Sequence, residues 1–337
     1  MVLLAIRAGV AFVMVAICAA PVMPACAQEA PANPMGRPPA HFSASPALAP
    51  TPTPMPAHPA DDVLDGRGDG HDRMTVPVRI EVRSGTHGPF AFLVDTGSER
   101  TVIARSVAQA AGLVPVEQAV LVGVAGYSQV DLVMVDTIDL GRRSLYGVKS
   151  PLLDAHDIGA DGIVGIDGLQ GQRVLLDFDH KRMAIGDART LGGNTGYDIV
   201  VTARRKSGQL IMTDADIDGI ATQVVIDTGS DTSIGNAALE RALSRRGGTE
   251  TVQLRSVTGQ NATARLGLAH ALNLGGMTLR NTMIAFVDAP PFARLGLRGR
   301  PALLLGMAQL RLFHRVAIDF ATRRILFDTP AEAAAHS

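Results

Sequence analysis

Tryptophan is absent from this 337-residue chain, aromatic residues make up only 4% of it, and its formal net charge is −1. With few aromatic rings, the chain has little with which to stack on single-stranded bases. With almost no net charge, it has no bulk electrostatic attraction to a polyanion or to an anionic membrane surface. We therefore expect no nucleic acid as a partner.

Cysteine is also scarce, and the only two, Cys18 and Cys26, lie within the first 27 residues. This segment has one cation, Arg7, before an apolar run over residues 8–20, and a small-x-small pattern at 25–27 that is typical of a signal peptidase site. The apolar run is shorter than the roughly 20 residues of a membrane-spanning helix. We predict a signal peptide over residues 1–27.

Cleavage of that signal peptide would give a periplasmic or secreted bacterial protein without thiols, which is held together by its core and not by disulfides. An uncleaved membrane anchor and a lipoprotein modified at Cys26 stay open as alternatives. Only these two alternatives would place the protein on a membrane.

Patterns of metal ligands and cofactor motifs are missing too. The nine histidines show no HExxH or comparable spacing. Asp161 precedes the stretch "GIVGIDG" and Asp167 lies within it, and we interpret this segment as a loop leading into the next structural element and not as a metal site. Neither a serine nucleophile elbow nor a dinucleotide-binding fingerprint occurs. The sequence therefore predicts neither a metal nor a cofactor.

Proline density marks where the folded part begins. Residues 28–60 contain ten prolines and almost no apolar periodicity, which is typical of an extended linker. We place this disordered linker at 28–72, an N-terminal lobe at 73–190, a C-terminal lobe at 191–330 and a short tail at 331–337. From Met74 onward, "MTVPVRIEVR" alternates apolar and polar residues as a strand does.

Most of the remaining pattern consists of short strands bounded by glycines, with two helical stretches at Ala104–Leu113 and Asn236–Arg246. Each predicted helix follows a copy of Asp-Thr-Gly by about ten residues. The chain is therefore expected to be mainly β, with one short helix in each half.

The sequence repeats itself. "FLVDTGSERTVI", beginning at Phe92, returns as "VVIDTGSDTSIG", beginning at Val224, with Asp95 and Asp227 in matched places. Four further pairs follow in the same order: "VAGYSQ" with "VTGQNA", "DLGRRSL" with "NLGGMTL", "GIVGIDGL" with "LLLGMAQL", and "VLLDFDHKRMAIGD" with "VAIDFATRRILFDT". Two copies of one unit are too few for a solenoid and predict two similar lobes.

The two aspartates suggest acid–base chemistry. Each follows at least three apolar residues, so a buried strand delivers it to a turn that the next glycine makes tight. If a pseudo-twofold axis sets the two carboxyl groups side by side, they share a proton, because two like charges about 3 Å apart cannot both ionise cheaply. One member then takes a proton from water and the other protonates a carbonyl oxygen.

We assign supporting roles to the residues that follow each aspartate. The threonine hydroxyls are expected to hydrogen-bond across the axis, the glycines to permit close approach, and the serine hydroxyls to donate to the outer carboxylate oxygens. The serine donors would favour the carboxylate form and activity at acidic pH. These residues are Thr96, Gly97 and Ser98 in the first copy and Thr228, Gly229 and Ser230 in the second.

On these motifs, residues 74–330 resemble the aspartic peptidases of the retropepsin and pepsin kind. The resemblance implies two pseudo-twofold-related β-barrel lobes with a cleft between them and one catalytic aspartate from each, Asp95 and Asp227. It also implies that an apolar-apolar-Gly element and a short helix brace each active-site strand, here at 163–169 and 304–310.

Two flaps, hairpins that close over an extended polypeptide substrate, are implied as well. The first would have Gly126 and Tyr127 at its tip, and the second Gly259 and Gln260. Retropepsins are homodimers, whereas here both units are in one chain, so we expect a monomer that acts as a pseudo-dimer. A homodimeric enzyme, a non-catalytic peptide-binding or scaffold protein, and a proenzyme stay open.

Overall fold

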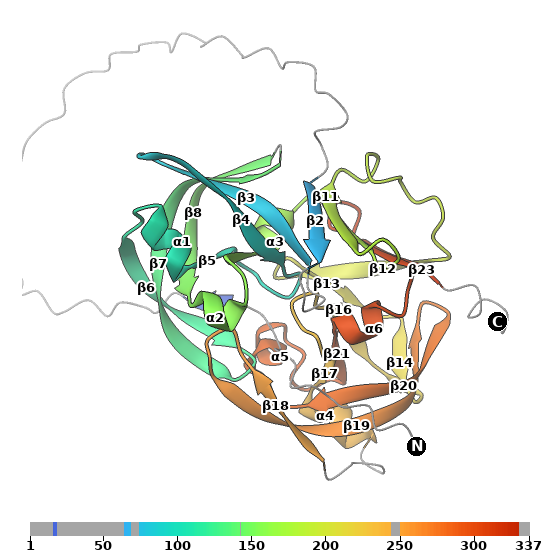
Figure 1. Ribbon diagram of the computed structural model, residues 1–337. Helices are drawn as coiled ribbons and strands as arrows, with labels where there is room; N and C mark the ends of the chain where they lie inside the picture. The colour runs from blue at the N-terminus through green and yellow to red at the C-terminus, as the bar shows by residue number, and fades with distance from the viewer. Residues whose placement is uncertain (1–15, 19–63, 69–73, 142, 244–249, 330–337) are drawn as a thin grey trace, which may run out of the picture.

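The computed structural model describes residues 16–18, 64–68, 74–141, 143–243 and 250–329 (Figure 1). This part of the chain is mainly β-sheet and forms two β-barrel-like lobes. Most of the predicted signal peptide and linker, and all of the predicted C-terminal tail, lie outside the described residues. Inside those predicted segments, β1 (Ala16–Cys18) pairs with β6, and β2 (Leu64–Gly68) pairs with β11 and β3, so residues 64–68 belong to a sheet.

The first lobe is a closed barrel of six strands, and a seventh strand, β6, extends from it as a hairpin with β7. Its pairings run from β3 through β4, β9, β5, β8 and β7 back to β3. The strands are β3 (Met74–Val82), β4 (Gly85–Val94), β5 (Val102–Ala104), β6 (Pro115–Gly123), β7 (Gly126–Leu140), β8 (Arg143–Leu153) and β9 (Gly162–Val164).

The second lobe repeats this order, as the sequence predicts. Its pairings run from β13 through β16, β21, β17, β20 and β19 to β14, with β18 as the hairpin partner of β19 and β15 as that of β14. Two short strands, β13 and β14, take the place of the long β3. The strands are β13 (Gln209–Met212), β14 (Ala215–Ile217), β15 (Ile220–Ala221), β16 (Gln223–Ile226), β17 (Ile234–Gly235), β18 (Thr251–Arg255), β19 (Asn261–Leu274), β20 (Met277–Phe286) and β21 (Ala302–Leu305).

Local sequence explains which strands face solvent. In β3 the apolar residues Met74, Val76, Val78 and Ile80 are buried and most residues between them are exposed, which confirms the period-two prediction. The ends of β4 and β16 are instead apolar at every position and fully buried, because each lies between two neighbouring strands inside its lobe. The uninterrupted apolar run before each Asp-Thr-Gly thus belongs to a central strand.

The helices are short. Both predicted helices are present, as α1 (Arg105–Ala110) and α4 (Ala237–Leu243). The helices that the resemblance implies after each apolar-apolar-Gly element are α3 (Ile166–Leu169) and α6 (Met307–Leu310). The sequence did not reveal α2 (Ala155–Ile158) and α5 (Pro290–Arg294), because one turn is too short to show a helical period.

A six-stranded joining sheet connects the lobes and continues into both, through the β2–β3 pairing and the β12–β13 pairing (Figure 1). Strands β11 and β10 of the first half lie beside β22 and β23 of the second in the order β2–β11–β10–β22–β23–β12, so the halves meet where β10 pairs with β22. At its centre, Arg173 on β10 lies opposite Asp319 on β22, and their side chains form a 2.8 Å ion pair, each only 1% exposed. The remaining strands are β10 (Arg173–Asp177), β11 (Arg182–Gly186), β12 (Ile199–Lys206), β22 (Arg315–Asp319) and β23 (Arg324–Asp328).

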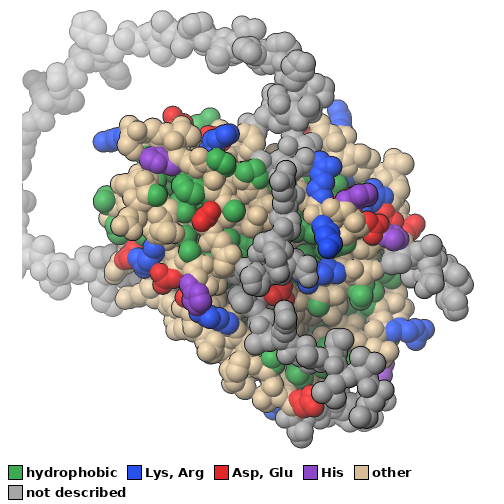
Figure 2. Space-filling model, viewed as in Figure 1, with side chains coloured by type: hydrophobic (Ala, Val, Ile, Leu, Met, Phe, Trp, Pro, Cys, Tyr) green, Lys and Arg blue, Asp and Glu red, His purple; other side chains and the backbone are tan. Residues whose placement is uncertain are grey.

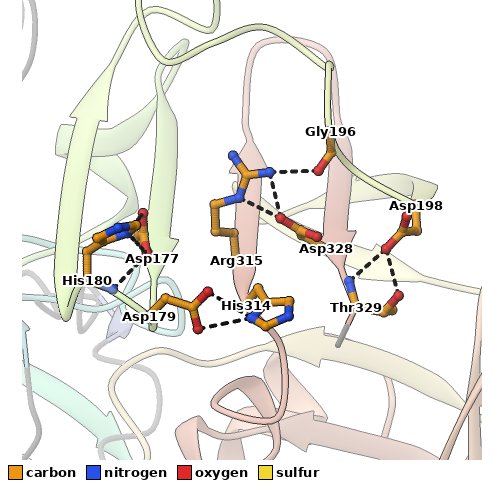
Figure 3. A network of polar contacts seen from close by, with 9 residues as sticks. All are labelled: Asp177, Asp179, His180, Gly196, Asp198, His314, Arg315, Asp328 and Thr329. Carbon is orange, nitrogen blue, oxygen red and sulfur yellow. Dashed lines mark hydrogen bonds and ion pairs between the residues drawn. The ribbon is translucent and has the colours of Figure 1, made fainter. Parts of the chain in front are cut away.

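Polar contacts also cross this sheet at its rim (Figure 3). His314 contacts Asp179, in the turn between β10 and β11, at 2.8 Å, and this hydrogen bond raises the pKa of the imidazole. Arg315 pairs with Asp328 at 2.6 Å. Because the contacts of His314 and Arg173 link residues from opposite halves, the two lobes are tied together by side chains as well as by backbone ladders.

The surface carries charges of both signs. On the face shown in Figure 2, basic, acidic and apolar side chains are interspersed, in keeping with the net charge of −1. Among the described residues, no helix is both long enough and apolar enough to cross a membrane.

We expect Asp319→Ala to lower the free energy of unfolding by about 3–5 kcal/mol, because the variant leaves the buried Arg173 guanidinium without its counter-charge. Urea denaturation measures this change. Asp288→Ala is the matched control: it breaks the exposed Arg298–Asp288 pair, whose side chains are 72% and 46% exposed, and should change stability by about 0.5 kcal/mol or less. Equal effects of the two substitutions would contradict the structural role of the buried pair.

Candidate active site

The two Asp-Thr-Gly turns lie at the ends of central strands. β4 pairs in parallel with β9, and the amide of Asp95 donates to the Val164 carbonyl at 3.0 Å. In the second lobe β16 pairs in parallel with β21, and the amide of Asp227 donates to the Leu305 carbonyl, also at 3.0 Å. Each aspartate is therefore fixed by the strand that precedes it and by the apolar-apolar-Gly element beside it.

The two threonines hold the turns together across the pseudo-twofold axis. The Thr96 hydroxyl donates to the Ile226 carbonyl at 2.9 Å, and the Thr228 hydroxyl donates to the Val94 carbonyl at 2.7 Å. Each hydroxyl also accepts from the other threonine's amide, at 3.2 Å for Thr96 and 3.0 Å for Thr228. The hydrogen bonds expected across the axis are thus present, four in all, and they join the two lobes at the site.

The carboxyl groups of Asp95 and Asp227 meet at this junction, where the two residues are 1% and 0% exposed. Each packs against the other lobe's glycine. A Cβ on Gly97 would lie 2.6 Å from Asp227 Oδ1, and one on Gly229 would lie 2.4 Å from Asp95 Oδ2. Because real Cβ atoms do not approach that closely, only glycine lets the two turns come together.

Backbone amides, and not the serine hydroxyls, donate to the carboxylates. Asp95 Oδ1 accepts from the amides of Gly97 at 2.7 Å and Ser98 at 3.0 Å, and Asp227 Oδ1 accepts from the Gly229 amide at 3.2 Å.

The Ser98 and Ser230 hydroxyls each donate 2.7 Å bonds to a backbone carbonyl two residues further on. The expectation that these hydroxyls donate to the outer carboxylate oxygens is wrong, because a hydroxyl has one hydrogen and a backbone carbonyl already accepts it. Since the serine hydroxyls do not donate to the carboxylates, they give no reason to expect activity at acidic pH.

A second pair of side chains braces the turns, and the sequence did not single it out for this role. Thr101 donates to Asp167 on α3 at 2.7 Å and accepts from the Gly165 amide at 3.2 Å. In the second lobe Ser233 contacts Gln309 on α6 and accepts from the Gly306 amide at 3.0 Å. The only signal was a hydroxyl residue six positions after each aspartate.

The carboxylates next to "GIVGIDG" have structural roles. Asp167 holds Thr101, and Asp161 accepts from the Ala91 amide at 2.9 Å. Among the described residues, no group of three or more His, Cys, Asp or Glu side chains is placed to hold a metal ion.

Burial sets the electrostatics of the aspartate pair. Desolvation raises the pKa of Asp95 from 3.8 to about 7, against the lowering effect of the Gly97 and Ser98 amides. Desolvation, and then the nearby Asp95 charge, raise the pKa of Asp227 well above its ordinary value. Over a range of pH the pair therefore holds one proton, and the two amide hydrogen bonds to Asp95 favour the carboxylate on that residue.

The predicted flap residues lie at the tips of two hairpins. Gly126 and Tyr127 follow the tight turn between β6 and β7, in which Gly123 pairs with Gly126, and Tyr127 is 62% exposed. Gly259 and Gln260 lie in the turn between β18 and β19. A Cβ on Gly126 would lie 3.9 Å from Gln260 Oε1, so the tips of the two hairpins meet.

The sequence profile of the family described as aspartyl protease matches the chain twice, over residues 76–168 and 213–308. The two matches cover more than half of the chain, and each contains one Asp-Thr-Gly turn, one hairpin and most of one bracing element. The chain therefore belongs to the aspartyl protease family, as two retropepsin-like units in one polypeptide. No curated protein matches it.

We expect Thr96→Val to destabilise the protein by about 2–4 kcal/mol, because it removes the donor to Ile226 and leaves the Thr228 amide without an acceptor. Thr96→Ser keeps the hydroxyl and should destabilise the protein much less. Denaturant unfolding of both variants tests this, and equal losses would mean that the hydrogen bonds across the axis contribute little.

The aspartate pair should also make stability depend on pH. A folded-state pKa of about 7 against 3.8 means that the folded protein binds this proton more tightly than the unfolded chain does. Protonation of Asp95 therefore stabilises the folded protein, and this stabilisation is fully present below about pH 3.8 and is lost as pH rises through about 7. Asp95→Asn removes this titration. The free energy of unfolding of the variant, relative to that of the wild type, should therefore rise by on the order of a few kcal/mol from acidic to alkaline buffers. Parallel stability curves in denaturant unfolding would contradict the assignment.

Proposed function

We propose that the protein is an exported aspartic endopeptidase, which hydrolyses peptide bonds of extended polypeptides by activating water between Asp95 and Asp227. One observation carries the proposal: two buried carboxyl groups, one from each lobe, each lie against the other's Asp-Thr-Gly turn. A lone buried aspartate is costly, whereas a pair that shares a proton offsets much of that cost and is ready for acid–base work.

The asymmetry of the pair supports distinct roles. Asp95 accepts two backbone hydrogen bonds of 3.0 Å or less, which stabilise its carboxylate, whereas Asp227 accepts a longer one from Gly229. Burial and the Asp95 charge keep the proton on Asp227. In our proposal Asp95 is therefore the general base and Asp227 the general acid.

The reaction then needs no group beyond water and the two side chains. Asp95 takes a proton as the water oxygen attacks the peptide carbonyl carbon, while Asp227 gives its proton to the carbonyl oxygen. In the second step a hydroxyl of the tetrahedral intermediate returns a proton to Asp227. The proton on Asp95 passes to the departing nitrogen, and the carbon–nitrogen bond breaks. Both aspartates end in their starting protonation states.

Substrate class and cell location rest on further features. The hairpins β6–β7 and β18–β19 present strands that can pair with an extended peptide backbone, which is the reason for proposing polypeptides as substrates. The predicted signal peptide supports a periplasmic or secreted location.

Because one chain supplies both aspartates, the proposed active unit is a monomer. A homodimeric enzyme would lose activity on dilution, and a protein that binds peptides without cleaving them would yield no products.

We expect cleavage of a mixed peptide library at near-neutral pH, with the acid limb of the kcat/KM profile at about pH 7, where Asp95 ionises. Asp95→Asn and Asp227→Asn should each lower kcat by roughly 10²–10⁴-fold, the usual contribution of a general acid or base. Liquid chromatography with mass spectrometry of the products measures both.

Several outcomes would contradict this proposal. Binding of peptides without cleavage at any pH would favour the non-catalytic alternative. Activity that disappears on dilution in step with dissociation of a dimer would favour the homodimer. An acid limb far below neutrality would reject the assignment of Asp95 as the base.

A further inference from the structure

The two hairpins whose tips meet occupy matched places in the repeat. We call residues 121–127 the first flap and residues 254–260 the second flap. The tips are in contact at two points: Gly126 lies near Gln260, and a Cβ on Gly123 would lie 2.7 Å from Ser256 Oγ. If these hairpins cover the aspartates as flaps do, at least one of them must move before a polypeptide can reach the buried carboxyl groups.

Most anchoring residues are the same in both flaps. Leu121 and Leu254 are 0% and 1% exposed, and Val124 and Val257 are 2% and 1% exposed. These matched apolar side chains hold both flaps down to a similar extent. They therefore give no reason for one flap to open before the other.

The backbone of the first flap pairs with β1 at Leu121 and Val122, and among the side chains one position differs in kind. Val122 of the first flap is 3% exposed and belongs to an apolar cluster with Phe292 of α5. The matched residue of the second flap is Arg255, which forms a 2.5 Å ion pair with Asp157 on α2 of the first lobe. The helices explain the difference: "DAHDI" at 154–158 corresponds to "DAPPF" at 288–292, so Asp157 stands where α5 has the buried Pro291.

Asp157 also contacts the tip of the second flap. Gly259 has a positive φ of 76°, and a Cβ there would lie 2.6 Å from Asp157 Oδ2. The carboxylate thus lies against the tip backbone while it binds the Arg255 side chain. Both contacts cross between lobes, from α2 to the β18–β19 hairpin.

The two anchors differ in strength. Burying a valine side chain favours the docked flap by roughly tenfold or more. The Arg255 side chain is 40% exposed and that of Asp157 is 14% exposed, and an ion pair with one partner in solvent favours docking by at most about fivefold. Salt also screens the ion pair and leaves apolar burial almost unaffected.

We propose that the second flap is the gate of the active site, that the Asp157–Arg255 pair is its latch, and that the first flap is the stationary wall. Asp157 and Arg255 are then positioning residues, which act through the flap and not on the reacting atoms. That the opening admits a substrate rests on the proposed peptidase function, whereas the opening of the second flap before the first does not.

Hydrogen exchange followed by mass spectrometry measures the opening directly. An undocked hairpin is only marginally stable, so its amides exchange faster when it is released. In the wild-type protein we expect residues 254–260 to exchange faster than residues 121–127. Raising the ionic strength from roughly 0.05 M to 1 M should widen that difference.

Variants separate the latch from general loosening. Arg255→Gln should speed exchange of the second flap by about two- to fivefold and leave the first unchanged. The charge-swapped double variant, Asp157→Arg with Arg255→Asp, should restore protection. Arg265→Gln is the matched control: it breaks the Arg265–Glu240 pair within the second lobe and should change neither flap.

The proposal is overturned if the first flap exchanges faster in the wild type, if Arg255→Gln loosens both flaps equally, or if Arg265→Gln has the same effect. None of these readouts needs catalysis. Absence of peptide cleavage would therefore reject the proposed function without deciding the gate, and equal exchange of the two flaps would reject the gate without affecting the proposed function.

Discussion

Four hydrogen bonds between Thr96 and Thr228 and the opposite strands hold the two halves in register, and the rest of the site depends on them. They set the Asp-Thr-Gly turns so close that only glycine fits between each carboxyl group and its partner lobe. The buried Arg173–Asp319 pair and the β10–β22 pairing of the joining sheet also hold the two halves together. The site is therefore a property of the interface and not of either lobe.

Burial at that interface decides the chemistry. Desolvation is the largest influence on both aspartates and raises the pKa of each, so the pair keeps a proton at pH values where isolated carboxylic acids have lost theirs. Backbone amides of the turns, which every copy of such a turn provides, oppose this effect at Asp95. The neighbouring serine hydroxyls point to carbonyl groups instead and leave the carboxylates to the amides.

Duplication within one chain frees the two halves to differ. In a homodimer, one substitution would change both flaps, whereas here Val122 and Arg255 occupy matched positions with unlike partners. The aspartates differ as well, because Asp95 accepts shorter amide bonds than Asp227 does. An asymmetric pair of flaps and an asymmetric pair of carboxyl groups follow naturally from two units that share one polypeptide.

The sequence by itself determined the duplicated mainly β architecture, the places of α1 and α4, and the matched aspartates. Strand and helix periods depend on residues close together in the chain, and the repeat is visible when the two halves of the sequence are aligned. It did not determine that the serine hydroxyls face away from the carboxylates, or that Asp157 meets Arg255. Those outcomes depend on side-chain directions and on contacts between residues about a hundred positions apart. Only the tertiary structure fixed them, since the backbone turns and the packing of two lobes decide which neighbours each polar group meets.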